Sequence, residues 1–315
     1  MAKPAPPLSS PASPVPPAPD GLHPRNPHRA RYDFPQLVAA SPALAAFTRP
    51  HPLAGVTVDF ADPSAVLALN RALLFAYYGL TWWELPPGAL CPPVPGRADY
   101  LYHVAGLLAP TPAGSAVAVL EVGTGASCIY PIIGVRAWGW RFVATDSDEA
   151  SLRWAARLVA ANPVLTGHIE LRHQPDATAM FTHVTHPSER FALSICNPPF
   201  HASAAEADAG TQRKLRNLGA VAGRRDAQQR PVLNFGGRAH ELWCKGGELA
   251  FVRRMIAESA RHPALCRWFT CLIAKSSHLP LLTVALERAA AAEVRILPMR
   301  HGEKHSRILA WRFVA

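Results

Sequence analysis

The sequence has no run of about 18 consecutive apolar residues, which a membrane-spanning helix needs. It has no apolar stretch of a secretory signal behind Lys3, and too few basic residues before Arg25 for a transit peptide. Its six cysteines include no C-x-x-C pair, so neither a zinc site nor a disulfide framework is expected. These absences predict a cytoplasmic protein with reduced thiols, no bound metal and no membrane partner.

Positive charge is in excess, with 32 Lys and Arg against 22 Asp and Glu, a formal net charge of +10 over 315 residues. The charge is also clustered. One cluster lies between residues 210 and 240, where only Asp226 opposes Arg213, Lys214, Arg216, Arg224, Arg225, Arg230 and Arg238. A smaller cluster contains Arg25, His28, Arg29 and Arg31. A solvated surface segment is the ordinary interpretation of such a run, but clustered positive charge also suits a polyanionic partner such as nucleic acid.

Composition divides the chain into three stretches. Residues 1–21 are rich in proline and alanine, cannot pack a core, and are expected to form a disordered tail. Residues 22–110 are expected to form a small, mostly helical N-terminal region, with helices over about 63–79 and 98–109. Residues 111–315 alternate between strand and helix patterns and contain the basic loop at 201–235. We therefore expect one α/β domain with an N-terminal addition.

The alternating pattern predicts a doubly wound sheet. Strands are expected at 116–122, 141–146, 169–172, 191–196, 267–274, 293–297 and 307–314. Strands separated by helices imply parallel pairing through right-handed crossovers. The last connection, residues 298–306, is too short for a crossover helix, so the final pair should be antiparallel. A mostly parallel sheet with an antiparallel final strand points to the methyltransferase variant of the doubly wound fold.

Two segments favour an adenosine-type ligand. The first strand ends in a turn with two glycines, Glu121–Ser127, where the backbone lets a ligand approach and the next helix N-terminus offers N–H donors. Cys128 stands where a dinucleotide-binding motif has its third glycine, which favours a smaller adenosyl ligand. Asp146 ends the second strand and can accept both ribose hydroxyls. It can equally cap the next helix, although Ser147 or Asp148 would serve as well.

The sequence Asn197-Pro-Pro-Phe200 follows the fourth strand directly, at the sheet edge where open α/β folds bind ligands. The Asn197 amide oxygen and the Pro198 carbonyl are two fixed acceptors, which suit an amino group with two N–H donors. Phe200 offers a flat face to a planar ring. Accepting both N–H bonds turns the nitrogen lone pair towards an electrophilic methyl group. This pattern indicates methylation of an exocyclic amino group rather than a simple rigid turn.

The runs E-V-G-T-G-A-S-C-I-Y-P (121–131), N-P-P-F (197–200) and N-F-G-G-R-A-H-E-L-W-C-K-G-G-E (234–248) resemble the RlmF family of 23S rRNA adenine-N6 methyltransferases. Human methyltransferase-like proteins that act on RNA hairpins share the pattern. L-H-P-R-N (22–26) and P-G-R-A-D-Y (95–100) extend the resemblance over about residues 22–315. It implies a class I methyltransferase fold, S-adenosyl-L-methionine as donor, and one adenine of 23S rRNA as acceptor.

The resemblance also implies roles for individual residues. The donor is expected to contact Arg97, Glu121, Gly123, Thr124, Gly125, Ser127 and Asp146. The adenine is expected at the turn formed by Asn197, Pro198, Pro199 and Phe200. RNA phosphates are expected at Arg25, Arg29, Arg31, Arg213, Lys214, Arg216, Arg224 and Arg225. The partner would be 23S rRNA or a large-subunit assembly intermediate, and the protein a monomer.

Three other functions stay open at the level of sequence. A protein glutamine methyltransferase is possible because a side-chain amide fits an Asn-Pro-Pro-aromatic turn as an adenine does. An RNA-binding adaptor without turnover would keep the basic clusters and lose cofactor binding. DNA adenine methylation is the third, and only the family resemblance disfavours it.

Overall fold

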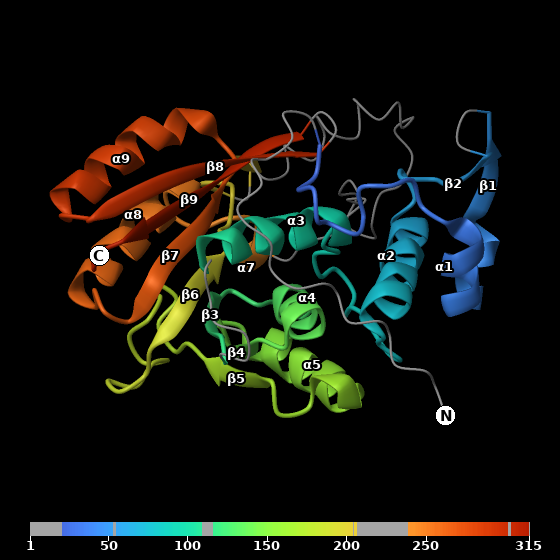
Figure 1. The fold of residues 1–315 in the computed structure, drawn as a ribbon, viewed down its shortest axis with the longest axis horizontal. Coiled ribbons are helices and arrows are strands. Elements are labelled where there is room, and N and C mark those ends of the chain that lie inside the picture. Colours follow the sequence, from blue (N-terminus) through green and yellow to red (C-terminus); the bar gives the residue numbers. More distant parts are fainter. Residues whose placement is uncertain are drawn as a thin grey trace.

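The computed structural model describes residues 21–52, 55–108, 116–203, 205–206, 239–301 and 304–314, and a seven-stranded sheet forms its centre (Figure 1). The strand order is β5-β4-β3-β6-β7-β9-β8. The strands are β3 (Ala118–Val122), β4 (Arg141–Asp146), β5 (Ile169–His173), β6 (Phe191–Cys196), β7 (Cys266–Ile273), β8 (Glu293–His301) and β9 (Lys304–Arg312). Strand order reverses between β3 and β6, which creates a crevice at their carboxyl ends.

The sheet is parallel from β5 to β7 and changes direction only at β9. Strand β9 pairs antiparallel with β7 through Phe269↔Trp311 and with β8 through Val294↔Trp311. The expected antiparallel final pair is therefore confirmed. The connection between β8 and β9 is too short for a crossover helix, which forces a hairpin.

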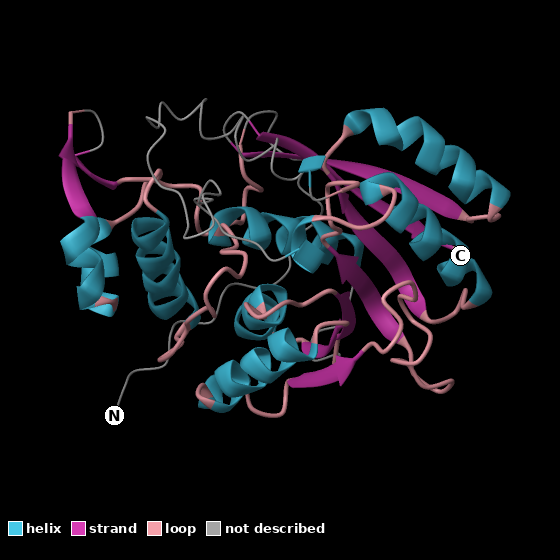
Figure 2. Ribbon diagram, turned by 180° about the vertical axis from the view of Figure 1, so that it is seen from behind, coloured by secondary structure: helices cyan, strands magenta, loops and turns pink. Residues whose placement is uncertain are grey.

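Helices cover both faces of the sheet (Figure 2). Helices α3 (Val94–Ala105), α4 (Ile129–Trp138) and α5 (Glu149–Ala160) bury side chains in a cluster with Val119 on one face. Helices α8 (Gly247–Arg261) and α9 (Leu279–Arg288) bury theirs in a second cluster with Leu120. Val119 and Leu120 are neighbours in β3, and successive side chains of a strand point to opposite faces. Burial on both faces explains why β3 and β6 consist largely of apolar residues.

Over its described residues, the N-terminal region contains two α-helices and a hairpin in addition to α3. Helix α2 (Pro63–Tyr78) matches the expected helix over 63–79; the Asp62 side chain caps it, and it ends at Gly79 with φ +67°. Helix α1 (Phe34–Ala40) and the hairpin of β1 (Thr48–His51) and β2 (Gly55–Val58) were not expected from the sequence.

The N-terminal region shares its hydrophobic core with the sheet. Buried side chains of α1 and α2 belong to the cluster that also contains α4, α5 and β3. Asn162 joins the two parts by polar contacts, because its side chain accepts from Thr81 N at 2.9 Å and donates to Trp82 O at 2.7 Å. The expected boundary between residues 110 and 111 and the tail at 1–20 lie outside the described residues. In the part of the chain that is described, no helix has the length and apolar character to cross a membrane.

Candidate functional site

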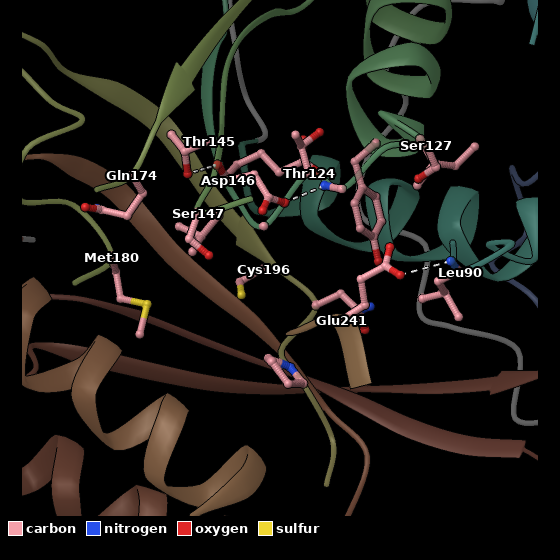
Figure 3. Close-up of a pocket in the computed structure, with 18 of the residues that line it drawn as sticks. Leu90, Thr124, Ser127, Thr145, Asp146, Ser147, Gln174, Met180, Cys196 and Glu241 are labelled. Carbon is pink, nitrogen blue, oxygen red and sulfur yellow. Dashed lines mark hydrogen bonds between the residues drawn. The ribbon is translucent and has the colours of Figure 1, made fainter. Parts of the chain in front are cut away.

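A pocket lies at the carboxyl ends of β3, β4 and β6 (Figure 3). Its walls enclose about 940 Å³, a volume that includes the open mouth. All seven residues expected to contact the donor line it: Arg97, Glu121, Gly123, Thr124, Gly125, Ser127 and Asp146. Asn197 and Pro199 of the expected adenine turn line the same pocket. Residues from four separate parts of the sequence therefore meet at the sheet edge.

The glycine turn presents bare backbone to the pocket. Gly123 has φ +80° and Gly125 has φ +61°, which favour glycine, and no atom lies within 4 Å of a Cβ built on Gly123. Cys128 also has a positive φ, +49°, at the N-cap of α4. A left-handed backbone conformation costs a residue with a side chain about 1–2 kcal/mol. Glycine, which a dinucleotide-binding motif has at this position, would adopt the conformation more easily.

Asp146 is held at the pocket wall by backbone donors. Its Oδ2 accepts from Gly125 N at 2.8 Å, and its Oδ1 accepts from Asp148 N at 2.9 Å. The N-cap of α5 is Asp148, whose Oδ2 accepts from Ser151 N at 2.9 Å. The alternative role of Asp146 as a helix cap is therefore excluded. Its carboxylate instead connects the ends of β3 and β4 at the place expected for a ribose.

Glu121 is a buried carboxyl group without a hydrogen bond from any described residue. It is 1% exposed, and burial raises its pKa to about 8, with a further rise from the negative charge of Asp146. Arg97 and Thr124 act in the opposite direction. A buried, unpaired acid facing a pocket is costly unless a ligand compensates it. S-adenosyl-L-methionine carries an ammonium and a sulfonium, so Glu121 fits this cofactor.

Arg97 provides a fixed positive charge on the same wall. It lies on α3, is 8% exposed, and donates through Nη1 to the Tyr130 hydroxyl at 3.2 Å. Its guanidinium carbon lies 5.6 Å from the centroid of the Tyr130 ring. These contacts fix the fork of the guanidinium, which is suited to a carboxylate such as that of a methionine moiety.

The turn after β6 brings Asn197 to the pocket. Its Oδ1 is buried and accepts no hydrogen bond from the residues that the structure describes. Pro199 lines the pocket, whereas the buried Pro198 and the half-buried Phe200 do not. After Phe200 the chain forms a parallel β-bridge between His201 and Trp243.

The expected RNA-contacting residues are only partly described. Arg25, Arg29 and Arg31 are exposed, whereas Asn26 and His28 between them are buried. His23 N donates to Asp99 Oδ1 at 2.6 Å and Asn26 Nδ2 donates to Pro95 O at 3.1 Å, which tie the segment to α3. The other expected contacts, Arg213, Lys214, Arg216, Arg224 and Arg225, lie outside the described residues, as does most of the loop at 201–235.

Some lining residues were not anticipated. Glu241, on the short helix α7 (Ala239–Leu242), accepts from Leu90 N at 3.0 Å, and its Oε1 lies 3.5 Å from a Cβ built on Gly125. The resemblance included Glu241 within the run 234–248 but assigned it no role. Met180 and Gln174 form another wall, which the sequence did not mark. Over the described ranges, no group of three or more potential metal ligands occurs.

Comparison with known proteins places these features in a family. The model of a family described as RNA methyltransferase matches residues 18–315. "Ribosomal RNA large subunit methyltransferase F" of Serratia proteamaculans is 49% identical over 298 residues, covering 93% of this chain and 88% of the relative. The protein of the same name from Ectopseudomonas mendocina is 51% identical over 302 residues, covering 94% and 90%.

Solved structures agree with this assignment. The hMettl16 catalytic domain in complex with MAT2A 3′UTR hairpin 1 has a TM-score of 0.78 at 29% identity, covering 94% of this chain and 96% of that one. The N-terminal domain of human METTL16 in complex with SAH has a TM-score of 0.74 at 26% identity, covering 94% and 100%. The expected class I methyltransferase fold and the resemblance to the RlmF family are thus confirmed. The chain belongs to this family of RNA methyltransferases.

Proposed function

We propose that this chain transfers a methyl group from S-adenosyl-L-methionine to N6 of one adenine in 23S rRNA. One observation carries the proposal. The buried Asn197 Oδ1, which accepts no hydrogen bond within the described chain, lines the same pocket as the donor-binding residues. A buried acceptor without a partner costs about 1–3 kcal/mol, which a ligand N–H would offset. Relatives named as large-subunit rRNA methyltransferases supply the substrate class.

Each donor-binding residue contacts a different part of the cofactor. Arg97 binds its carboxylate, and Glu121 compensates its positive charge within the buried end of the pocket. Asp146 accepts hydrogen bonds from the ribose hydroxyls. Gly123 lets the ligand approach the backbone, because no side chain occupies the space above it. When bound, the cofactor would supply a methyl carbon made electrophilic by the attached sulfonium, and the bond from this carbon to sulfur would break with its electron pair left on a neutral thioether.

The acceptor turn orients the amino group. Asn197 Oδ1 and the Pro198 carbonyl accept its two N–H bonds, and this draws the nitrogen lone pair out of conjugation and towards the methyl carbon. Phe200 stacks on the adenine ring. Pro199, which lines the pocket, stiffens the turn, so that the two acceptors are preorganised. The N6 proton becomes acidic once the new N–C bond forms, and water removes it, so no strong general base is required.

Basic residues bind the RNA backbone. Arg25, Arg29 and Arg31 contact phosphates from the N-terminal region, and the basic cluster at 213–225 contacts them from the loop at 201–235. Extracting the target adenine from its stack costs a few kcal/mol, which these contacts offset. We further propose a monomeric, cytoplasmic enzyme with an N-terminal RNA-contacting region at 22–110 and a methyltransferase domain at 111–315. Its substrate is 23S rRNA or a large-subunit assembly intermediate.

The proposal is tested with labelled S-adenosyl-L-methionine on three substrates: deproteinised 23S rRNA, assembling large subunits and a protein extract. Label recovered as N6-methyladenine at one rRNA position, and lost in Asn197→Ala, is the expected result. Label in protein glutamine would replace the proposal by glutamine methylation. No label with intact RNA binding would indicate an adaptor.

A further inference from the structure

The hydrogen-bonded ladder between β6 and β7 ends before β6 reaches the acceptor turn. The parallel ladder between β6 and β7 pairs Leu193 with Trp268 and Ser194 with Phe269, and these are the last partners of that ladder. Strand β7 continues to Ile273, but there it pairs only with β9. The final residue of β6, Cys196, thus has a β-sheet neighbour on the β3 side, Val122, and none on the β7 side within the described strands.

Side chains replace the missing ladder. Cys196 N donates to the Tyr100 hydroxyl at 3.3 Å, and the Tyr100 hydroxyl lies 2.8 Å from Thr270 Oγ1. Thr270 Oγ1 in turn donates to Ser194 O at 2.7 Å. Because Thr270 uses its proton on Ser194, it must accept from Tyr100. The direction of the chain is therefore fixed, from the Cys196 amide through Tyr100 and Thr270 to the Ser194 carbonyl.

These groups are fully enclosed. Tyr100, Thr270 and Ser194 are 0% exposed, and Cys196 is 1% exposed. Water therefore cannot readily substitute for a lost hydroxyl, and each member of the chain depends on the next. The Tyr100 hydroxyl also lies 3.4 Å from Cys196 O, so a single oxygen contacts both backbone polar atoms of that residue.

The position of this network matters because of the residues that follow. Cys196 immediately precedes Asn197, and the next two residues are prolines, which have no N–H. The turn therefore has few backbone donors with which to hold itself. Helix α3 also carries Arg97, which is three residues before Tyr100 and lies on the same helix face. One rigid helix thus contacts both the donor wall and the strand end that leads to the acceptor turn.

We propose that Tyr100 is a positioning residue for methyl transfer, which holds the end of β6, and with it Asn197, in register with the donor pocket through the Cys196 amide and Thr270. This inference rests on the proposed function for the step that it supports. Tyr100 does not line the pocket, so it acts through the residues that it holds. A displacement of about 1 Å in a reacting group can lower a rate on the order of 100-fold, so a small shift of the turn suffices.

The test uses variants of the full-length protein that remove single hydroxyls. Tyr100→Phe keeps the ring and its edge-to-face contact with Tyr130. Thr270→Val keeps the volume and loses the hydroxyl, whereas Thr270→Ser keeps the hydroxyl and loses a methyl group. Tyr102→Phe, on the same helix, is the control for loss of a tyrosine hydroxyl. We expect kcat to fall about 10–100-fold in Tyr100→Phe and Thr270→Val, with an unchanged Kd for S-adenosyl-L-methionine.

The other variants separate a positioning role from a merely structural one. Thr270→Ser and Tyr102→Phe should retain the wild-type kcat, and the double variant Tyr100→Phe/Thr270→Val should be no slower than either single variant, because both break one chain. A merely structural role would instead make the loss follow thermal stability, so that Thr270→Ser would be impaired as well. That pattern, or a wild-type kcat in Tyr100→Phe, would overturn the inference.

A second measurement does not depend on activity. Amide hydrogen exchange in the segment 191–200 should accelerate in Tyr100→Phe and Thr270→Val and stay unchanged in Tyr102→Phe, because the Cys196 amide loses its anchored acceptor. Unchanged exchange overturns the inference. If the wild-type protein methylates no RNA, the proposed function fails, and the exchange data then decide only whether Tyr100 holds the end of β6.

Discussion

Replacing Glu121 by glutamine is expected to stabilise the ligand-free protein increasingly as the pH rises, while weakening donor binding. In the unfolded chain this carboxyl group has its ordinary pKa of 4.5, whereas burial, reinforced by the charge of Asp146, raises its pKa in the folded protein to about 8. Between these pH values the folded state holds a proton that the unfolded state has released. The contribution of Glu121 to stability therefore falls as the pH rises.

The magnitude follows from the size of the pKa difference. One pKa unit corresponds to about 1.4 kcal/mol, so the destabilisation grows from near zero at pH 4.5 to about 3 kcal/mol at pH 7. It levels off above pH 8, where both states are ionised. Glutamine does not titrate, so its own cost of burial is the same at every pH. The difference in unfolding free energy between the variant and the wild type isolates the contribution of Glu121.

Urea unfolding at pH 5, 6, 7 and 8 measures this difference. We expect the variant to gain about 3 kcal/mol relative to the wild type across this range. Calorimetry at pH 8 should show weaker binding of S-adenosyl-L-methionine, because the compensating anion is absent. A difference in unfolding free energy that stays flat or falls with pH would refute the reasoning.

Glu258 provides the matched control because it is a buried glutamate in the opposite environment. Burial raises the pKa of Glu258, but four hydrogen bonds to its carboxylate outweigh this effect and lower the pKa overall. Three of these hydrogen bonds come from the backbone N–H groups of residues 180–182, and one comes from the Thr182 hydroxyl. The stability that it contributes is present above its ordinary pKa and is lost as the pH falls. Glu258→Gln should therefore destabilise the protein at pH 7, opposite in sign to Glu121→Gln.

Three further predictions concern stability. Gly134→Ala should cost about 1–3 kcal/mol or more in unfolding free energy, since its Cβ would lie 2.4 Å from Phe142 Cζ; an unchanged melting temperature would contradict this. Asn162→Ala should lower the unfolding free energy by about 1–3 kcal/mol for each backbone group left unpaired, such as Trp82 O. Midpoints of urea unfolding measure this loss. Burial lowers the pKa of His28 to about 4, so the unfolding free energy should fall as the pH falls from 6.5 towards 4. In acid unfolding, His28→Gln should lose less unfolding free energy than the wild type over that range.

Much of the central sheet could be predicted because its strands are buried on both faces. The strands at 141–146 and 191–196 have the same limits in the structure as in the sequence-based expectation. Apolar runs bounded by polar or glycine residues are enough to locate such elements. The motif residues could also be predicted, because parallel strands place their carboxyl ends at one edge.

The remaining features depend on tertiary contacts. The hairpin β1–β2 is mostly exposed and contains Pro50, so it lacks the alternation that identifies a strand. Glu241 reaches the pocket through its contact with Leu90, which is 151 residues away in sequence. The missing partner of Glu121 and the chain of hydroxyls at Tyr100 are properties of the packed core, and no local pattern reports them.

The central claim is that Asn197 holds the acceptor amino group while a separate set of residues holds the donor. Single-turnover methylation of 23S rRNA, combined with calorimetric binding of S-adenosyl-L-methionine, tests it with Asn197→Ala and Arg97→Ala side by side. The account predicts that Asn197→Ala lowers the rate at saturating donor on the order of 100-fold without changing donor affinity, whereas Arg97→Ala weakens donor binding. A wild-type rate in Asn197→Ala would contradict the claim.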